Sequence, residues 1–260
     1  GYVKGRVSGY LKGCRIIFPF ASVGATANAI MAAVLAKGTT ELLNVAREPE
    51  IIDLCKCLQS MGCDIEGAGE NRIIIDGVDN LRETTHEIVM DRIELGTYII
   101  AGAISDGDIK LTGGNIALLK KFIDKLYEVG VEVNECKDHL RVRRSKSSSI
   151  NCTNILTEPF PGFPTDLQAQ MMALLSVADG VSNIEEQIFE NRFMHVPELI
   201  RMGANIKIEG RKAIISGVSQ LKGAPVKATD LRASVSLVLA ALVAEGHTEI
   251  DKIHHIDRGY

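Results

Sequence analysis

Residues 166–180 read DLQAQMMALLSVADG, an acidic residue followed by an apolar run that ends at a glycine. The same pattern recurs at residues 91–107 and 230–246, and with a small polar residue, Ser22, in place of the acidic one at residues 22–38. In chain order, the glycine lies 16, 16, 14 and 16 residues after the first residue of each segment. A small polar or acidic residue before an apolar run, with a glycine after it, is typical of a helix with both ends marked. Four such helices predict a repeat protein.

A second helix is predicted in three of the four repeats. It ends at Gly62, Gly130 and Gly203, which lie 24, 23 and 23 residues after the first glycine. Stretches with the alternation of β-strands follow, such as residues 72–78 and 213–218. Each repeat is therefore predicted to run helix, strand, helix, strand, strand, with a final strand leading into the next helix.

The first helices of the repeats indicate how the repeats pack. Residues 30–36 and 236–243 are apolar on nearly every face, which is typical of a helix enclosed on all sides. We therefore expect an α/β fold of repeated helix and strand units, with buried helices and outward-facing sheets. This arrangement is the reverse of a doubly wound fold, in which helices cover both faces of one sheet.

The composition excludes several classes of protein. Hydrophobic residues make up 46% and charged residues 24%, as in ordinary globular proteins, and the longest apolar runs are too short to span a bilayer. The net charge is −4 and the basic residues are scattered, whereas nucleic-acid binding needs a concentrated basic face. Six cysteines are too sparse for a disulfide scaffold. We expect a reduced, cytoplasmic protein that binds neither nucleic acid nor a membrane.

Both ends of the chain fall inside a repeat. Residues 2–13 match the closing strands of the other repeats without the helices that should precede them. Tyr260 falls where the second helix of the last repeat would begin. We therefore expect this chain to be part of a longer protein.

The start of the first helix differs from the other three. Asp91, Asp166 and Asp230 stand at the beginning of the later helices, where an aspartate caps the helix and neutralises its partial positive charge. The first helix begins instead with residues 22–24, Ser-Val-Gly, a neutral cap and a glycine that permits close approach. Such a helix end suits a phosphate or diphosphate. The alternative is a serine cap that binds no ligand.

Asp166 is the candidate general base. It ends the segment FPGFPTD at residues 160–166, in which two prolines and a glycine stiffen the entry to the helix. A carboxylate held at one position suits general base catalysis. The alternative is a proline-rich loop that ends in an aspartate cap.

Arginines near the junctions of the repeats are candidates for holding an anionic ligand. Arg192, Arg232 and Arg258 are among them, and guanidinium groups suit carboxylates and phosphates. The alternative is that neighbouring acidic residues pair with them in structural bridges. The histidines follow no metal-ligand spacing, and no dinucleotide-binding fingerprint is present, so no metal or organic cofactor is predicted.

Several longer motifs resemble the enolpyruvyl transferase family, and within it the branch that acts on a UDP-sugar. These motifs are SVGAT at residues 22–26, AREPEI at 46–51, DRIE at 91–94, FPTDLQAQ at 163–170, FENRFMHVPEL at 189–199, ATDLRAS at 228–234 and HIDRGY at 255–260. They extend along the whole chain. The sister branch, which acts on shikimate phosphate, shares the repeat.

The resemblance implies a fold and a reaction. The fold is an inside-out α/β prism of two lobes, each built from three repeats, with residues 1–89 as the last repeat of the first lobe and residues 90–260 in the second lobe. The reaction transfers the enolpyruvyl group of phosphoenolpyruvate to the 3′-hydroxyl of UDP-N-acetylglucosamine and releases phosphate. It opens peptidoglycan precursor synthesis and uses no metal or organic cofactor.

The resemblance also assigns roles around the first helix. It implies that Phe20, Ala21, Ser22 and Val23 line the region of the nucleotide diphosphate, next to Gly24. Many relatives have lysine where this chain has Phe20, so one phosphate contact is expected to be missing or supplied elsewhere.

In the second lobe, the resemblance implies that Asp166 contacts the sugar hydroxyl and acts as the base. Ile188 would contact the sugar nucleotide. Arg258 would hold the carboxylate of phosphoenolpyruvate, with Arg192 and Arg232 as supporting charge. The general acid of the family is a cysteine on a loop that corresponds to sequence before Gly1, and none of the six cysteines of this chain matches it.

Two other functions stay open from the sequence. One is the shikimate phosphate branch, 3-phosphoshikimate 1-carboxyvinyltransferase. The other is a module that binds a sugar nucleotide without catalysis. We expect the isolated chain to be inactive, because the loop with the general acid and part of the cleft lie outside it.

Overall fold

Three of the predicted first helices connect two parallel strands. Helix α1 (Val23–Ala33) lies between β1 (Arg15–Ile17) and β2 (Thr39–Leu43). Likewise α5 (Gln168–Leu175) lies between β8 (Asn154–Leu156) and β9 (Val181–Glu185), and α7 (Leu231–Ala241) between β12 (Pro225–Lys227) and β13 (Glu249–Asp251). Each of these strand pairs is parallel. The computed structural model describes residues 4–144, 149–257 and 259–260. The chain divides into two compact units, an N-terminal unit of Gly1–Val89 and a C-terminal unit of Met90–Tyr260.

From residue 4 onward, the N-terminal unit contains one four-stranded sheet in the order β1-β2-β4-β3. Its elements are β1 (Arg15–Ile17), α1 (Val23–Ala33), β2 (Thr39–Leu43), α2 (Pro49–Ser60), β3 (Asp64–Glu66) and β4 (Arg72–Asp76). Strand β4 runs antiparallel to both β2 and β3, with Leu42 opposite Ile73 and Ile65 opposite Ile75. These four side chains are buried with Ile30 of α1 in one apolar core.

In the C-terminal unit, the described residues form three sheets in the orders β5-β7-β6, β10-β11-β9-β8 and β12-β13. Its first elements are α3 (Arg92–Ile104), β5 (Asp108–Thr112), η1 (Ile116–Leu119), α4 (Lys120–Glu128), β6 (Glu132–Glu135) and β7 (His139–Arg143). Then follow β8 (Asn154–Leu156), η2 (Thr165–Leu167), α5 (Gln168–Leu175), β9 (Val181–Glu185), α6 (Val196–Arg201), β10 (Asn205–Glu209) and β11 (Lys212–Ser216). The last elements are β12 (Pro225–Lys227), α7 (Leu231–Ala241), β13 (Glu249–Asp251) and η3 (Ile253–His255).

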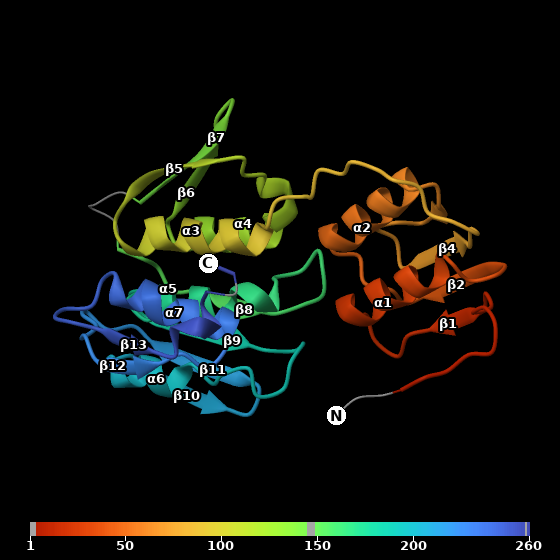
Figure 1. Ribbon diagram of the computed structural model, residues 1–260. Helices are drawn as coiled ribbons and strands as arrows, with labels where there is room; N and C mark the ends of the chain where they lie inside the picture. Colours follow the sequence, from red (N-terminus) through yellow and green to blue (C-terminus); the bar gives the residue numbers. More distant parts are fainter. Residues whose placement is uncertain (1–3, 145–148, 258) are drawn as a thin grey trace. The chain divides into compact units, whose positions relative to one another are not determined.

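Three helices form the interior of the C-terminal unit. Helices α3, α5 and α7 pack against one another, and the sheets lie outside them (Figure 1). All eight residues of α5 are buried, and its apolar side chains join those of α3 and α7 in one core. The prediction of an α/β fold with buried helices and outward-facing sheets is confirmed in this unit.

Helix α1 differs from the prediction of complete enclosure. Of its eleven residues, Thr26, Ile30 and Ala33 are buried, whereas Met31 is 49% exposed. Within the described residues α1 packs against α2 and its own sheet, while α5 lies between two other helices. A helix that is apolar on every face is thus buried only where neighbouring elements cover it.

The ends of the second helices are as predicted. Gly62, Gly130 and Gly203 follow α2, α4 and α6, and all three have the positive φ angle that a glycine adopts without steric cost after a helix. The prediction of closing strands near the start of the chain is wrong for the described residues 4–13, where Lys12 forms only an isolated bridge with Lys37. None of the helices in the described ranges combines the length and apolar character that crossing a bilayer requires.

Candidate functional site

Helices α3 and α7 begin with aspartate caps, as predicted. A carboxylate oxygen of Asp91 accepts hydrogen bonds from the backbone N–H groups of Ile93 at 2.7 Å and Glu94 at 3.0 Å. Asp230 accepts in the same way from Arg232 and Ala233, both at 2.8 Å. These carboxylates satisfy amides that the helices leave without partners, so their first role is to hold the helix ends.

Asp166 differs from these two caps, and the prediction that it caps its helix is wrong. It lies inside the short helical turn η2, one turn before α5, and its side chain accepts no backbone N–H as a cap. The turn begins after Pro164, and the backbone N–H of Leu167 bonds to the Pro164 carbonyl. The extra turn moves Asp166 off the capping position and leaves its carboxylate to another partner.

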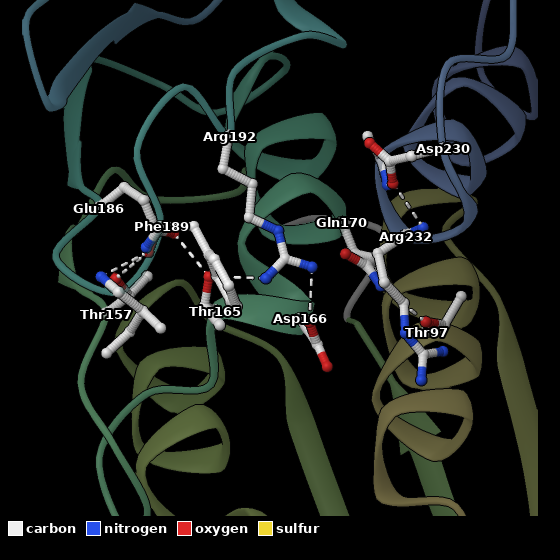
Figure 2. A network of polar contacts seen from close by, with 12 residues as sticks. Thr97, Thr157, Thr165, Asp166, Gln170, Glu186, Phe189, Arg192, Asp230 and Arg232 are labelled. Atoms are coloured by element: carbon white, nitrogen blue, oxygen red, sulfur yellow. Dashed lines mark hydrogen bonds and ion pairs between the residues drawn. The ribbon is translucent and has the colours of Figure 1, made fainter. Parts of the chain in front are cut away.

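That partner is Arg192. Its Nη2 donates to Asp166 Oδ1 at 2.5 Å, and its Nη1 donates to Thr165 Oγ1 at 2.9 Å (Figure 2). The guanidinium also lies 5.0 Å from the centre of the Phe189 ring, a cation–π contact. The Arg192 side chain is only 19% exposed, whereas Asp166 is 39% exposed. Arg192 thus fixes the carboxylate while leaving it open to a ligand.

A buried carboxylate, Glu186, organises the loop that carries Arg192. Glu186 is 1% exposed. Its Oε1 accepts from the Thr157 hydroxyl at 2.9 Å and from the backbone N–H groups of Ile188 at 2.9 Å and Phe189 at 3.1 Å. Its Oε2 accepts from the Thr165 hydroxyl at 2.8 Å. One carboxylate therefore ties the loop to the turn before α5.

The sequence does not distinguish Glu186 from its neighbour. Glu185 is exposed at the end of β9, and only the register of the strand turns Glu186 inward. The predicted site residue Ile188 lies within this loop and is partly buried, and Glu186 holds its backbone N–H. Arg258 lies outside the described residues.

Arg232 lies at the start of α7, close to Asp91 at the start of α3 and to Tyr260. Its Nη2 is 3.8 Å from Asp91 Oδ2, and its Nη1 donates to the hydroxyl of Tyr260 at 3.4 Å. The Arg232 side chain is 20% exposed. Arg192 and Arg232 thus both lie largely buried near the starts of the central helices of the C-terminal unit (Figure 2).

The five predicted residues of the N-terminal unit are consecutive around the start of α1. Ser22 caps the helix, and its Oγ accepts from the N–H of Ala25 at 3.4 Å. Phe20 is 69% exposed, and a side chain at Gly24 would meet nothing within 4 Å. The first turn contains no acidic residue. The amides at this helix end therefore keep their partial positive charge and are open to an anion.

His195 is a buried group that the sequence left without a role. It precedes α6 and is fully buried, and neither ring nitrogen has a hydrogen-bond partner among the described residues. Burial lowers the pKa of its imidazole from 6.5 to about 4; the charge of Asp230 opposes this shift and that of Arg192 adds to it. The ring is therefore neutral at physiological pH.

The described part of the chain offers no metal site. No group of three or more His, Cys, Asp or Glu side chains within residues 4–144, 149–257 and 259–260 is placed to hold a metal ion. The C-terminal unit offers two ordered arginines and one open carboxylate, groups that suit an anionic ligand with a hydroxyl to deprotonate. The N-terminal unit by itself offers a helix end without acidic residues, which suits an anion.

Comparisons with known proteins agree with this chemistry. The chain is 59% identical over 260 residues to a UDP-N-acetylglucosamine 1-carboxyvinyltransferase of Dinoroseobacter shibae and 57% identical over 260 residues to one of Ruegeria pomeroyi. It is matched along its whole length and spans 61% and 62% of these two relatives.

Solved structures give the same fold. The enolpyruvyl transferase NikO of Streptomyces tendae matches with a TM-score of 0.88 and 27% identity, over 96% of this chain and 62% of that protein. An EPSP synthase of Acinetobacter baumannii matches with a TM-score of 0.70 and 19% identity, over 94% of this chain and 59% of that one, which is a likeness of fold alone.

A known sequence family covers the chain almost completely. Residues 2–260 match the pattern of EPSP synthase (3-phosphoshikimate 1-carboxyvinyltransferase). The resemblance to the enolpyruvyl transferases is thereby confirmed, and the chain belongs to the EPSP synthase (3-phosphoshikimate 1-carboxyvinyltransferase) family.

Proposed function

We propose that this chain is part of an enzyme that transfers the enolpyruvyl group of phosphoenolpyruvate to the 3′-hydroxyl of UDP-N-acetylglucosamine and releases phosphate. The observation that carries the proposal is the Asp166–Arg192 pair, an ordered and open carboxylate beside a largely buried guanidinium. The name of the two relatives that are 59% and 57% identical supports the choice of UDP-N-acetylglucosamine as the acceptor. The reaction would belong to the longer protein and would supply peptidoglycan synthesis in the cytoplasm.

In the proposed reaction, Asp166 takes the proton of the acceptor hydroxyl. The hydroxyl oxygen then bonds to C2 of phosphoenolpyruvate, which becomes electrophilic as C3 is protonated by a general acid from outside this chain. Phosphate leaves from C2 and the double bond is restored by loss of a proton from C3. Arg192 keeps the carboxylate of Asp166 in one direction, and this control of position is a large part of such catalysis.

The arginines of the C-terminal unit are proposed to hold the anionic substrate. Phosphoenolpyruvate carries a carboxylate and a phosphate, and Arg232 and Arg192 would supply charge to them together with Arg258. Two of these guanidinium groups are ordered by neighbouring side chains of the unit. Preformed charge of this kind stabilises a developing anion without reorganisation during the reaction.

In the N-terminal unit, the start of α1 is proposed to bind the diphosphate of the sugar nucleotide through Ser22, Val23 and Gly24. Phe20 and Ala21 would flank the same region. The exposure of Phe20 and the open space at Gly24 leave the backbone accessible to a phosphate. We further propose that this unit is the last repeat of a first lobe and that the C-terminal unit belongs to a second lobe.

Phosphate release by the full-length protein that contains this chain tests the proposed function. With phosphoenolpyruvate present, we expect release with UDP-N-acetylglucosamine and none with shikimate 3-phosphate. Release with shikimate 3-phosphate alone would assign the protein to the sister reaction. Binding of UDP-N-acetylglucosamine without release would indicate a module that binds the sugar nucleotide only. The isolated chain of 260 residues is expected to release no phosphate above the blank.

A further inference from the structure

A chain of polar side chains joins the three central helices beneath Arg232. Thr97 comes from α3 and Gln170 from α5, and both are buried, at 4% and 0% exposure. Gln170 Nε2 donates to Thr97 Oγ1 at 3.1 Å, and Thr97 Oγ1 lies 2.9 Å from the hydroxyl of Tyr260. Tyr260 in turn accepts from Arg232 Nη1 (Figure 2 shows Thr97, Gln170 and Arg232).

The chemistry of the groups determines the direction of each hydrogen bond. A guanidinium has no acceptor, so Arg232 donates to Tyr260. Tyr260 is the donor to Thr97, because the single proton of the Thr97 hydroxyl is committed to a backbone carbonyl. Thr97 then uses its own proton for the carbonyl of Ile93, 2.9 Å away. Thr97 thus accepts twice and donates once, which is the full capacity of a hydroxyl.

The position of Tyr260 is set by its own segment. Its backbone N–H bonds to the carbonyl of Ile256 at 3.2 Å, and Ile256 is buried at 7% exposure. A Cβ at the preceding residue, Gly259, would lie 3.1 Å from the Leu231 side chain, so the segment passes close to the start of α7. Tyr260 is therefore fixed at both its backbone and its hydroxyl.

We propose that Tyr260 is a positioning residue for Arg232, and that Thr97 acts through it. The hydroxyl of Tyr260 holds one terminal nitrogen of the guanidinium while Asp91 lies 3.8 Å from the other. The guanidinium then presents its remaining N–H groups in one orientation to the anionic substrate. This inference rests on the proposed function, because it assigns Arg232 to the binding of phosphoenolpyruvate.

The substitution Tyr260→Phe in the full-length protein removes the hydroxyl and keeps the ring. We expect kcat/KM for phosphoenolpyruvate to fall about tenfold, the size typical of a hydrogen bond to a charged group. We expect the KM for UDP-N-acetylglucosamine to stay within about twofold, since loss of one interaction need not change both substrates. A general loss of structure would instead lower the apparent kcat, and with it kcat/KM for both substrates alike.

Substitutions at Thr97 show whether the two hydroxyls act as one path. Thr97→Val should cause the same defect for phosphoenolpyruvate, and Thr97→Ser, which keeps the hydroxyl, should restore near-normal values. The double variant Thr97→Val with Tyr260→Phe should be no worse than either single one, because residues that act through one another are not additive. Tyr127→Phe is the matched control, since Tyr127 lies on α4 and its hydroxyl donates to the Val133 carbonyl of β6, away from Arg232.

The outcomes separate the inference from the function. If the unmodified full-length protein forms no enolpyruvyl product, the proposed function is wrong and the inference falls with it. If that protein is active and Tyr260→Phe behaves like Tyr127→Phe, the inference alone is wrong. Defects of Thr97→Val and Tyr260→Phe that multiply in the double variant would also overturn it, because the two residues would then act independently.

Discussion

At the scale of residues, the site depends on which carboxylates are already committed. Asp91 and Asp230 each accept two backbone N–H groups at a helix end. Glu186 is enclosed and accepts four hydrogen bonds. Asp166 caps nothing and meets a single arginine, so of these four carboxylates it is the one that we propose to meet a substrate hydroxyl.

Replacing Glu186 by glutamine tests its role in ordering the loop. The glutamine NH2 group is a donor, and it would replace one of the two oxygens that accept from Thr157, Thr165 and two backbone N–H groups. At least one buried donor would therefore lose its acceptor. We expect the free energy of unfolding to fall by about 1–3 kcal/mol, measured as a lower Tm of the full-length protein by calorimetry. Glu185→Gln, at the exposed neighbouring position, is the control, and equal Tm values for the two variants would contradict this role.

The sequence predicts the caps Asp91 and Asp230 because an aspartate before an apolar helix has a simple physical reason. The sequence wrongly predicts Asp166 as a cap, because an aspartate at the cap of a helix and an aspartate within a short helical turn before that helix have the same sequence pattern. Glu186 escapes notice for a related reason. Its importance comes from the register of β9 and from Thr165, a residue 21 positions away.

At the scale of elements, close backbone contacts recur at equivalent places in the repeats. A Cβ at Gly217, after β11, would lie 1.6 Å from the carbonyl oxygen of Ala178. A Cβ at Gly77, after β4, would lie 1.7 Å from the carbonyl oxygen of Ala36. In both repeats the chain after the last strand thus passes against the segment that follows the first helix, and only glycine permits this approach.

Gly217→Ala tests this packing. The added methyl group would overlap a backbone oxygen, so the strand or the helix end must move, and overpacking of this kind typically costs about 1–3 kcal/mol or more. We expect a clear drop in the Tm of the full-length protein, and a similar drop for Gly77→Ala. Gly5→Ala, where a Cβ meets nothing within 4 Å, should leave Tm unchanged. A Tm for Gly217→Ala equal to that for Gly5→Ala would contradict the close contact between Gly217 and the Ala178 carbonyl.

Helix positions and their glycine ends were predictable from spacing, because local sequence determines both. The exposure of α1 was not, because an apolar helix is enclosed only if enough neighbours surround it. Met31 and the residues of α5 look alike in the sequence, yet Met31 is half exposed and α5 is fully buried. Enclosure belongs to the assembly of repeats and cannot be read from one helix.

At the scale of the whole molecule, His195 links stability to pH. Its pKa is about 4 in the folded protein and 6.5 ordinarily, so between these values the unfolded chain binds a proton that the folded chain does not. Stability from the neutral ring is therefore fully present above about pH 6.5 and is lost as the pH falls toward 4. The slope is at most about 1.4 kcal/mol per pH unit.

His195→Leu removes this titration and places an apolar side chain of similar size at the buried position. Between pH 6.5 and 4.5, we expect the Tm of the full-length protein to fall less in this variant than in the unmodified protein. His247→Leu, at an exposed position, should keep the original dependence. Parallel curves of Tm against pH for all three proteins would show that protonation of His195 does not cause the loss of stability at low pH.

The central claim is that Asp166 acts as the base of an enolpyruvyl transfer to UDP-N-acetylglucosamine, and kcat of the full-length Asp166→Asn protein tests it most directly. We predict a loss of about 10²–10⁴-fold, as for removal of a general base. Tm should stay nearly unchanged, because a partly exposed ion pair contributes little and Asp166 caps no helix. Asp108→Asn, which breaks an exposed pair with Arg141, should keep normal kcat. A kcat for Asp166→Asn close to that of the unmodified protein would contradict the claim.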